Sequence, residues 1–262
     1  MIRPSPPLFF WVHAGELLSA GLNTIGFSWI GSPAATELEV ILLDQLASAL
    51  GLPPRFLSPD APPASPGRTG GGVIQCTASD AVLVALLAAR ARVREREGAG
   101  AGASPEAVYA VDARLVVYTS DQAHSCVVKA AMVAGVLRVR ALPTTAGDGF
   151  ALTPATLAAA VAADVDAGLL PTLVVATLGT TSTCAVDPVD ELAAVAAAAG
   201  AWTHVDAAYA GVFMLAPSLR PAFTFAAVDS FSTNMHKSGM VSERTPQTWF
   251  ENFLSGAAGR AG

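Results

Sequence analysis

The fold is decided by a strand–helix–strand unit in residues 172–206, which read TLVVATLGTTSTCAVDPVDELAAVAAAAGAWTHVD. The first six residues are almost all apolar, as expected of a strand whose two faces are both buried in a parallel sheet. Asp187-Pro188 then begins a helix, and Asp190 lies in its first turn, where a carboxylate interacts favourably with the helix dipole. A second strand follows and ends on Asp206. The unit therefore predicts two parallel strands joined by a crossover helix.

The same alternation of strands and helices continues on both sides of this unit. Further strands are expected at 115–118, 136–141 and 226–232, and further helices at 33–50, 77–94, 123–134 and 153–163. This order favours an α/β domain with a mostly parallel sheet.

Composition limits the classes of protein that fit. Of the 262 residues, 52% are hydrophobic and 14% are charged, which indicates a well-buried core and excludes a disordered chain. The net charge of −6 argues against nucleic-acid binding, which needs a clustered basic face. The densest basic run, Arg90–Arg96, alternates with Ala, Val and Glu, and we interpret it as the solvated end of a helix rather than a phosphate-binding patch. Apolar stretches such as Ala81–Ala89 are shorter than the ~20 residues of a membrane-spanning helix.

The cysteines and the N-terminus indicate a cytoplasmic protein. Cys76, Cys126 and Cys184 are scattered and odd in number, which predicts neither a disulfide framework nor a zinc site. No signal peptide is predicted at the N-terminus. The low charge content predicts some apolar surface that contacts a partner subunit or a further domain.

Polar residues cluster where the predicted strands end, and ligands of such sheets bind at the carboxyl ends of the strands. Each residue alone has a simpler interpretation as a turn, a cap or a solvated loop position. Together they place an acid, a base, two imidazoles and several hydroxyls on one rim: Ser120, Asp121, His124, Thr180, Thr181, Asp206, His236 and Lys237.

Four ordered segments carry a resemblance to a known family. They are SDQAHS at 120–125, ATLGTT at 176–181, HVDAAYAG at 204–211 and NMHK at 234–237. In this order they resemble the group II pyridoxal-phosphate (PLP) decarboxylases, and most closely the aromatic-L-amino-acid decarboxylases. The similarity covers about 13–237. Its N-terminal segments resemble the plant tyrosine and tryptophan decarboxylases: LSAGLN at 18–23, GFSW at 26–29 and SPAATELE at 32–39.

The resemblance implies pyridoxal 5'-phosphate as the cofactor and gives four residues their roles. Lys237 matches the lysine that binds the cofactor covalently, and a buried amine with a lowered pKa would be a good nucleophile for this step. Asp206 matches the acid that pairs with the pyridine nitrogen. His124 matches the imidazole that stacks on the ring. Ala208 matches the small residue on the opposite ring face.

The resemblance also implies how the rest of the cofactor is held. Its phosphate is expected near Ala78 and Ser79, at the start of a helix that follows Gly70–Gly72, where free backbone N–H groups favour an anion. Thr181 resembles the family threonine near the cofactor. His236 resembles the histidine that precedes the lysine.

Three N-terminal residues are expected in the substrate pocket. Ile25, Phe27 and Trp29 correspond to aromatic-pocket residues that the family supplies across a homodimer interface. Ordinary core packing is the other interpretation of these three residues, and the sequence leaves both open.

The implied fold is the large domain of a PLP-dependent transferase of the aspartate aminotransferase type I, with the C-terminal small domain missing. Residues 1–12 are expected to be a divergent N-terminal segment, 13–237 the incomplete PLP-binding large domain, and 238–262 a polar tail outside the family. The chain is thus interpreted as a truncated member, because the family motif gives way after Lys237.

The implied reaction is decarboxylation of an aromatic L-amino acid (tyrosine, dopa or tryptophan) to an arylalkylamine. The alternative is a truncated, non-catalytic homologue that keeps the fold and binds PLP or a full-length subunit. Aldehyde synthesis, an oxidative variant within the family, is a third hypothesis. His124 keeps the residue of ordinary decarboxylases, which argues against that variant.

Overall fold

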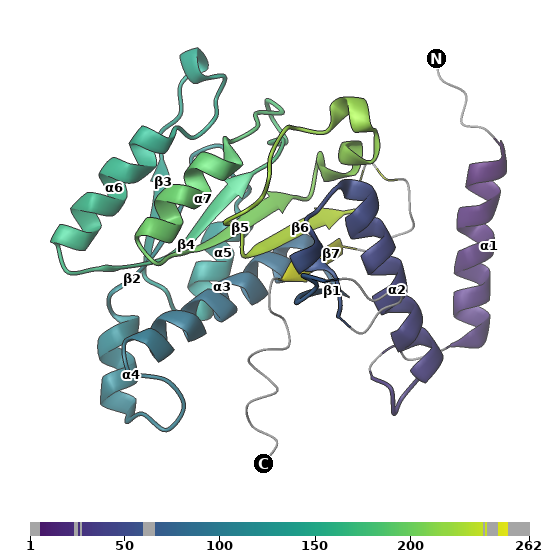
Figure 1. Cartoon of the computed structure of the whole chain (residues 1–262), viewed down its shortest axis with the longest axis horizontal. Helices are drawn as coiled ribbons and strands as arrows, with labels where there is room; N and C mark the ends of the chain where they lie inside the picture. The colour runs from purple at the N-terminus through teal and green to yellow at the C-terminus, as the bar shows by residue number, and fades with distance from the viewer. Residues whose placement is uncertain are drawn as a thin grey trace.

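The computed structural model describes residues 6–23, 26, 28–59, 66–237, 239 and 246–250, and for 6–12 and 246–250 it describes the backbone only. One sheet runs through the centre of the described chain, in the order β1-β7-β6-β5-β4-β2-β3 (Figure 1). Its strands are β1 (Gly71–Ile74), β2 (Leu115–Ser120), β3 (Arg138–Leu142), β4 (Leu170–Thr177), β5 (Trp202–Ala207), β6 (Ser230–Asn234) and β7 (Pro246–Phe250).

The five expected strands are β2 to β6, and their expected parallel arrangement is confirmed. β7 pairs antiparallel with both β6 and β1. The expected polar tail, 238–262, thus contributes a strand to the sheet. Residues 226–229, expected in the last strand, form a loop instead, and β6 begins at Ser230.

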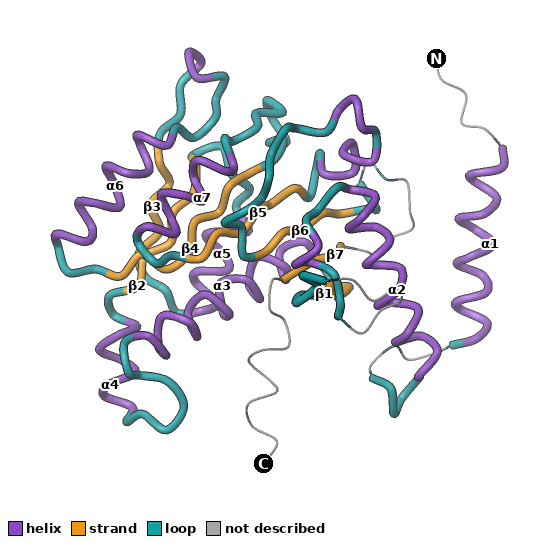
Figure 2. Tube along the Cα trace, viewed as in Figure 1, coloured by secondary structure: helices purple, strands orange, loops and turns teal. Residues whose placement is uncertain are grey.

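Helices cover both faces of the sheet (Figure 2). They are α1 (Pro6–Leu22), α2 (Pro33–Leu50), α3 (Ala78–Arg96), α4 (Pro105–Asp112), α5 (Cys126–Ala134), α6 (Pro154–Asp166) and α7 (Val189–Ala198). Short 3₁₀ helices occur at η1 (Pro54–Phe56), η2 (Ala146–Asp148), η3 (Gly211–Leu215) and η4 (Pro217–Leu219). The expected helix 123–134 begins only at Cys126, because the preceding residues form a loop.

Alternating side chains of the strands divide the core into two layers. In β4, Leu173 and Val175 pack with α3 and α5, while Val174 and Ala176 pack with α2, α6 and α7. All eight side chains of β4 are buried, as the continuous apolar run at 172–177 predicts. The three-layer arrangement leaves the ends of the strands as the open edges of the domain.

The helix α1 lies to one side of this body, beyond α2 (Figure 1). Its described side chains include three largely exposed leucines: Leu17, Leu18 and Leu22. In the part of the chain that the structure describes, no helix is both long and apolar enough to cross a membrane.

Candidate active site

A cavity of about 330 Å³ lies at the carboxyl ends of β4, β5 and β6 and beside the first residues of α3. Seven residues that the family resemblance assigns to the site line it together: Ala78, Ser79, His124, Thr181, Asp206, Ala208 and Lys237. Thr180 of the expected rim also lines it. The structure therefore brings the amine, the carboxylate and the imidazole to one place, although they come from distant parts of the chain.

Asp206 is the buried acid of this cavity. It lies near the end of β5, and its Oδ1 accepts a hydrogen bond of 3.0 Å from the backbone N–H of Ala208. Burial raises the pKa of Asp206, whereas that hydrogen bond and the positive charge of Lys237 lower it. A buried carboxylate of this kind is stabilised by a cationic partner. Among the described residues, its Oδ2 makes no hydrogen bond.

The imidazole of His124 is held by the backbone of the next helix. The N–H of Cys126 donates to Nδ1 at 3.1 Å. Because Nδ1 accepts this bond, the neutral ring carries its proton on Nε2. The Cys126 thiol also lines the cavity, and burial raises its pKa to about 12, so it is a neutral group at physiological pH.

Lys237 and His236 follow β6, but only Lys237 lines the cavity. The backbone N–H of Lys237 donates to Asn234 O at 3.3 Å, and the side chain is exposed, so the expected burial of the amine is wrong. His236 turns to Asn234 instead, with 3.1 Å between its Nε2 and Asn234 Nδ2. Its Nδ1 is buried and has no hydrogen-bond partner.

The N-terminus of α3, which lies far from these loops in the sequence, forms another wall of the cavity. Thr77 caps the helix, and its Oγ1 accepts a hydrogen bond of 3.1 Å from Asp80 N. The backbone N–H groups of Ala78 and Ser79 make no hydrogen bond among the described residues. They are therefore free donors at the positive end of the helix dipole, as an anion site requires.

The loop after β4 forms another wall, and it turns sharply. Gly179 has a φ of +82°, which favours glycine, and a Cβ at this position would lie 2.3 Å from Ala210 Cβ. Thr180 Oγ1 lies 2.7 Å from Thr183 Oγ1 and accepts a hydrogen bond from Ala185 N. This loop presents Thr181 to the cavity.

Sequence reasoning missed several residues that line the cavity. Gln122 and Tyr209 lie within the quoted motifs, but no chemical feature of the sequence singled them out. Thr177 closes the buried strand β4, and its Oγ1 is buried without a hydrogen-bond partner. The signal for Thr177 was available, since a hydroxyl that ends an otherwise apolar parallel strand lies at the ligand-binding edge.

None of the three expected substrate-pocket residues is seen to line the cavity among the described residues. Ile25 and Phe27 fall outside the described residues. Trp29 does not line the cavity; its side chain is 58% exposed, and its Nε1 donates to Glu37. Their proposed role across a subunit interface stays a prediction.

The residues present fit PLP on three observations. Asp206 has an oxygen without a partner beside the cavity, Thr177 has a buried hydroxyl without one, and the first amides of α3 are free. In the same order, these groups can form hydrogen bonds with the pyridine nitrogen, a polar ring substituent and the phosphate of PLP. Ala208 contributes only a methyl group, which leaves room for a flat ring.

An α/β domain with these groups at the carboxyl edge of its sheet has the architecture of a PLP-dependent large domain. The model of the pyridoxal-dependent decarboxylase conserved domain matches residues 9–253. The chain belongs to this family.

Relatives and solved structures agree with this assignment. The chain is 48% identical over 231 residues to a tyrosine decarboxylase of Oryza sativa subsp. japonica, covering 85% of this chain and 39% of the relative. It is 46% identical to a phenylacetaldehyde synthase of Arabidopsis thaliana, covering 85% of this chain and 42% of the relative. The crystal structure of Oryza sativa TDC with PLP and tryptamine superposes with a TM-score of 0.84 at 43% identity, covering 93% of this chain and 47% of that chain. The chain thus spans less than half the length of these relatives.

Proposed function

We propose that this chain takes part in the PLP-dependent decarboxylation of aromatic L-amino acids to arylalkylamines, with tyrosine, dopa and tryptophan as the substrate class. The observation that carries the proposal is the single cavity onto which Lys237, Asp206 and His124 all open. Similarity to a tyrosine decarboxylase supports the substrate class.

Each residue has a task that its surroundings support. The Lys237 amine, which lines the cavity, would bind the cofactor covalently. The Asp206 carboxylate holds a proton on the ring nitrogen, and the buried site strengthens this interaction. Bound PLP supplies the electron sink that accepts the charge left when carbon dioxide departs.

The remaining walls of the cavity bind and orient the cofactor. The free amides of Ala78 and Ser79 bind the phosphate, and Thr181 contacts the cofactor from the loop after β4. His124 stacks on the ring with its proton on Nε2, which faces away from the Cys126 amide held by Nδ1. His236 positions the segment before Lys237 through its contact with Asn234.

A homodimer in the cytoplasm completes the proposal. The exposed Trp29 and the exposed leucines of α1 support a subunit interface, where Ile25, Phe27 and Trp29 would serve the partner's pocket. The three free cysteines support a reducing compartment. The division into 1–12, 13–237 and 238–262 stays a prediction, and because β7 of the last segment pairs with β1 and β6, we expect limited proteolysis to leave residues 246–250 associated with the large domain.

The two lysines of the sequence, Lys129 and Lys237, allow a sharp test of the cofactor site. Purified protein is incubated with PLP and reduced with borohydride, and the modified peptide is identified by mass spectrometry. We expect the adduct on Lys237 and none on Lys129, which is exposed on α5. Lys237→Ala should abolish both the visible absorbance and the adduct, while Lys129→Ala should retain them.

Activity is then measured on the same samples with tyrosine, dopa and tryptophan. Amine and carbon dioxide in equal amounts, lost in Lys237→Ala, support the decarboxylase. Aldehyde with ammonia and peroxide would support the oxidative variant, which the similarity to phenylacetaldehyde synthase keeps open. A cofactor adduct without any product would support the non-catalytic alternative, and no adduct on Lys237 would refute the site.

A further inference from the structure

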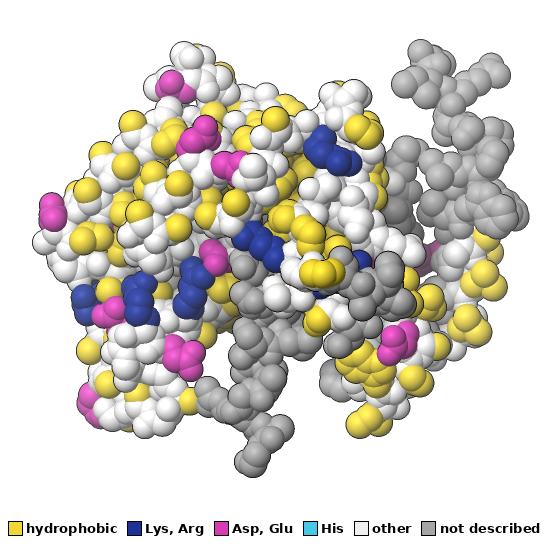
Figure 3. All heavy atoms as spheres, viewed as in Figure 1, with side chains coloured by type: hydrophobic (Ala, Val, Ile, Leu, Met, Phe, Trp, Pro, Cys, Tyr) yellow, Lys and Arg dark blue, Asp and Glu magenta, His cyan; other side chains and the backbone are white. Residues whose placement is uncertain are grey.

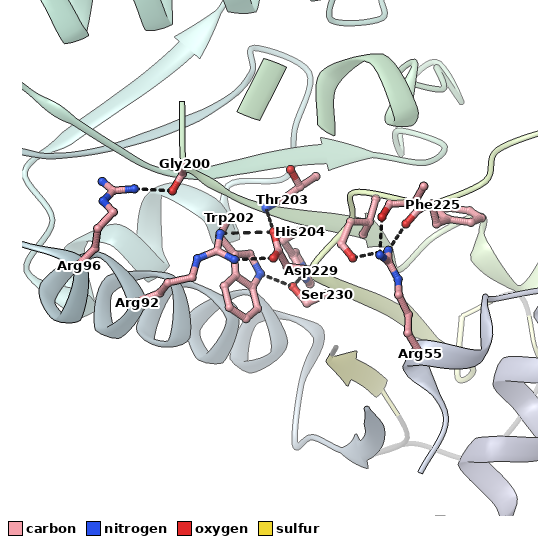
Figure 4. A network of polar contacts seen from close by, with 12 residues as sticks. Arg55, Arg92, Arg96, Gly200, Trp202, Thr203, His204, Phe225, Asp229 and Ser230 are labelled. Carbon is pink, nitrogen blue, oxygen red and sulfur yellow. Dashed lines mark hydrogen bonds and ion pairs between the residues drawn. The ribbon is translucent and has the colours of Figure 1, made fainter. Parts of the chain in front are cut away.

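A second cavity lies at the opposite, amino-terminal edge of the sheet. It has a volume of about 440 Å³ and is bordered by the segments that precede β5 and β6, by η1 and by the end of α3. Figure 4 shows its arginines, with Arg92 and Arg96 rising from α3 and Arg55 reaching in from η1. No residue of this cavity is shared with the proposed PLP site.

The charge of this cavity is opposite to that of the chain. Its lining includes Arg55, Arg92 and Arg96 but a single carboxylate, Asp229, which leaves an excess of positive charge. The whole chain has a net charge of −6. Figure 3 shows Lys and Arg side chains in a row near the middle of the face in view, with Asp and Glu side chains among them. Two arginines of the basic run that the sequence analysis interpreted as a solvated helix end, Arg92 and Arg96, thus line one wall of a cavity.

One wall is a loop whose carbonyl groups are already occupied. Arg55 donates to the backbone oxygens of Phe225, Ala226 and Val228. Asp190 fixes the same loop from the other side by accepting the N–H groups of Thr224 and Phe225. Since Arg55 takes up these carbonyl oxygens, they do not repel an anion in the cavity.

The other wall carries arginine N–H donors that make no hydrogen bond among the described residues. Arg92 pairs with Asp229 at 2.5 Å and lies 4.6 Å from the centre of the Trp202 ring. Arg96 donates through Nη1 to Gly200 O at 2.8 Å and through Nε to Glu97. Among the described residues, Arg92 Nε and Arg96 Nη2 make no hydrogen bond.

Small residues provide the room between these walls. Ala197, Ala201, Ala226 and Ala227 line the cavity. At Gly200, a Cβ would lie 2.3 Å from Arg96 Nη1, so glycine is what allows Arg96 to approach this edge of the sheet. Arginines that only complement the end of a helix need no such cavity beside them.

We propose that this cavity binds a phosphate-bearing anion, of the size of a diphosphate group. The planar guanidinium fork with spare N–H donors suits phosphate oxygens, and the fixed walls reduce the ordering that binding requires. A cavity of 440 Å³ exceeds the needs of a single small ion and falls in the range of small-molecule sites. The proposal does not depend on the proposed decarboxylation.

The test is a calorimetric titration of inorganic pyrophosphate into protein saturated with PLP, at an ionic strength held constant with sodium chloride. Saturation with PLP prevents the probe from occupying the N-terminus of α3. Ala197→Glu places a carboxylate in the cavity, while Ala198→Glu adds the same charge to the adjacent exposed position, which does not line it. We expect saturable binding that Ala197→Glu weakens about tenfold or more, and Ala198→Glu by no more than about twofold.

A second pair of variants tests the donors directly. Arg96→Gln should weaken pyrophosphate binding by about tenfold, because it removes a charge and a spare donor. Arg138→Gln, on β3 and away from the cavity, should leave binding unchanged. The proposal is overturned if the unmodified chain shows no saturable binding, or if Ala197→Glu and Ala198→Glu weaken it equally. If PLP is not bound, the same two pairs still decide the result, since they lie outside the cofactor cavity.

Discussion

The buried carboxylate of Asp187 accepts a hydrogen bond of 2.7 Å from the backbone N–H of Thr177, the last residue of β4. Its other oxygen accepts one of 2.8 Å from Leu152 N. The backbone N–H of Asp187 also donates to Thr177 O at 3.0 Å, which closes the loop that carries Thr181. Asp187 therefore joins the two ends of the loop between Thr177 and Asp187, and this loop forms a wall of the proposed cofactor site.

Asp187→Ala should weaken PLP binding as well as stability. The substitution leaves two buried N–H donors without a partner, each costing about 1–3 kcal/mol, so we expect a loss of about 2–6 kcal/mol. Since the same donors hold Thr177 and its loop, the dissociation constant for PLP should rise. Urea unfolding and titration of PLP absorbance measure the two effects separately.

Asp190→Ala is the matched control for this prediction. Asp190 also accepts two backbone N–H groups, but from Thr224 and Phe225, which do not line the PLP cavity. It should lower the free energy of unfolding and leave the PLP affinity of the folded protein unchanged. Equal loss of PLP affinity in both variants would show that Asp187 acts only through global stability.

Ala208→Val should weaken cofactor binding. Ala208 is buried beside Asp206 and lines the cavity, so two added methyl groups take up space that a flat ring needs. Overpacking of about 1–3 kcal/mol corresponds to a PLP affinity reduced by about fivefold to a hundredfold. Ala141→Val, on the exposed side of β3, should bind PLP normally. Unchanged PLP affinity in Ala208→Val would exclude Ala208 from the ring site.

The sequence predicted the central strands and the convergence of Lys237, Asp206 and His124, because both follow from local pattern and strand order. Apolar runs identify buried parallel strands, and polar residues directly after them meet at one edge. The strands β1 and β7 were not predicted. Each lies in a stretch without apolar alternation, and their pairing is fixed by long-range contacts.

The orientation of individual side chains could not be predicted in the same way. His236 precedes Lys237 in the motif, yet its ring turns to Asn234 because the chain reverses after β6. The run around Arg92 looked solvated because the Trp202 ring and Asp229, which meet it, are more than 100 residues away. Contacts of this range are set by the fold and leave no local signal.

Acid should remove the contribution of Asp164 to stability. Arg140 donates to both oxygens of Asp164, and the Tyr118 hydroxyl donates to Oδ2 at 2.9 Å. The Arg140 hydrogen bonds, and then that of Tyr118, hold the pKa of Asp164 below its usual range. Because the pKa is lower in the folded state, this stabilisation is complete above the unfolded value of about 3.9 and is lost as the pH falls through the folded value.

Asp164→Asn tests this pH dependence. At pH 7 it should lower the free energy of unfolding by about 1–3 kcal/mol, because hydrogen bonds to a charged group are replaced by neutral ones. The difference between the variant and the unmodified chain should shrink at pH values below the folded pKa of Asp164. Urea unfolding at pH 7 and near pH 2 makes the comparison, and a difference independent of pH would contradict the assignment.

Gly179→Ala should be more damaging than Gly135→Ala, although both glycines have a positive φ. Gly135 has a φ of +73° and open space around its missing Cβ, so alanine there costs only the strained backbone, about 1–2 kcal/mol. At Gly179 the φ is +82° and the new Cβ would also meet Ala210 Cβ at 2.3 Å, which adds an overpacking cost of about 1–3 kcal/mol. Relieving this contact must move either η3 or the loop that lines the cavity, so PLP affinity should fall in Gly179→Ala alone. Equal losses of stability in the two variants, measured by urea unfolding, would show that the contact with Ala210 relaxes without cost.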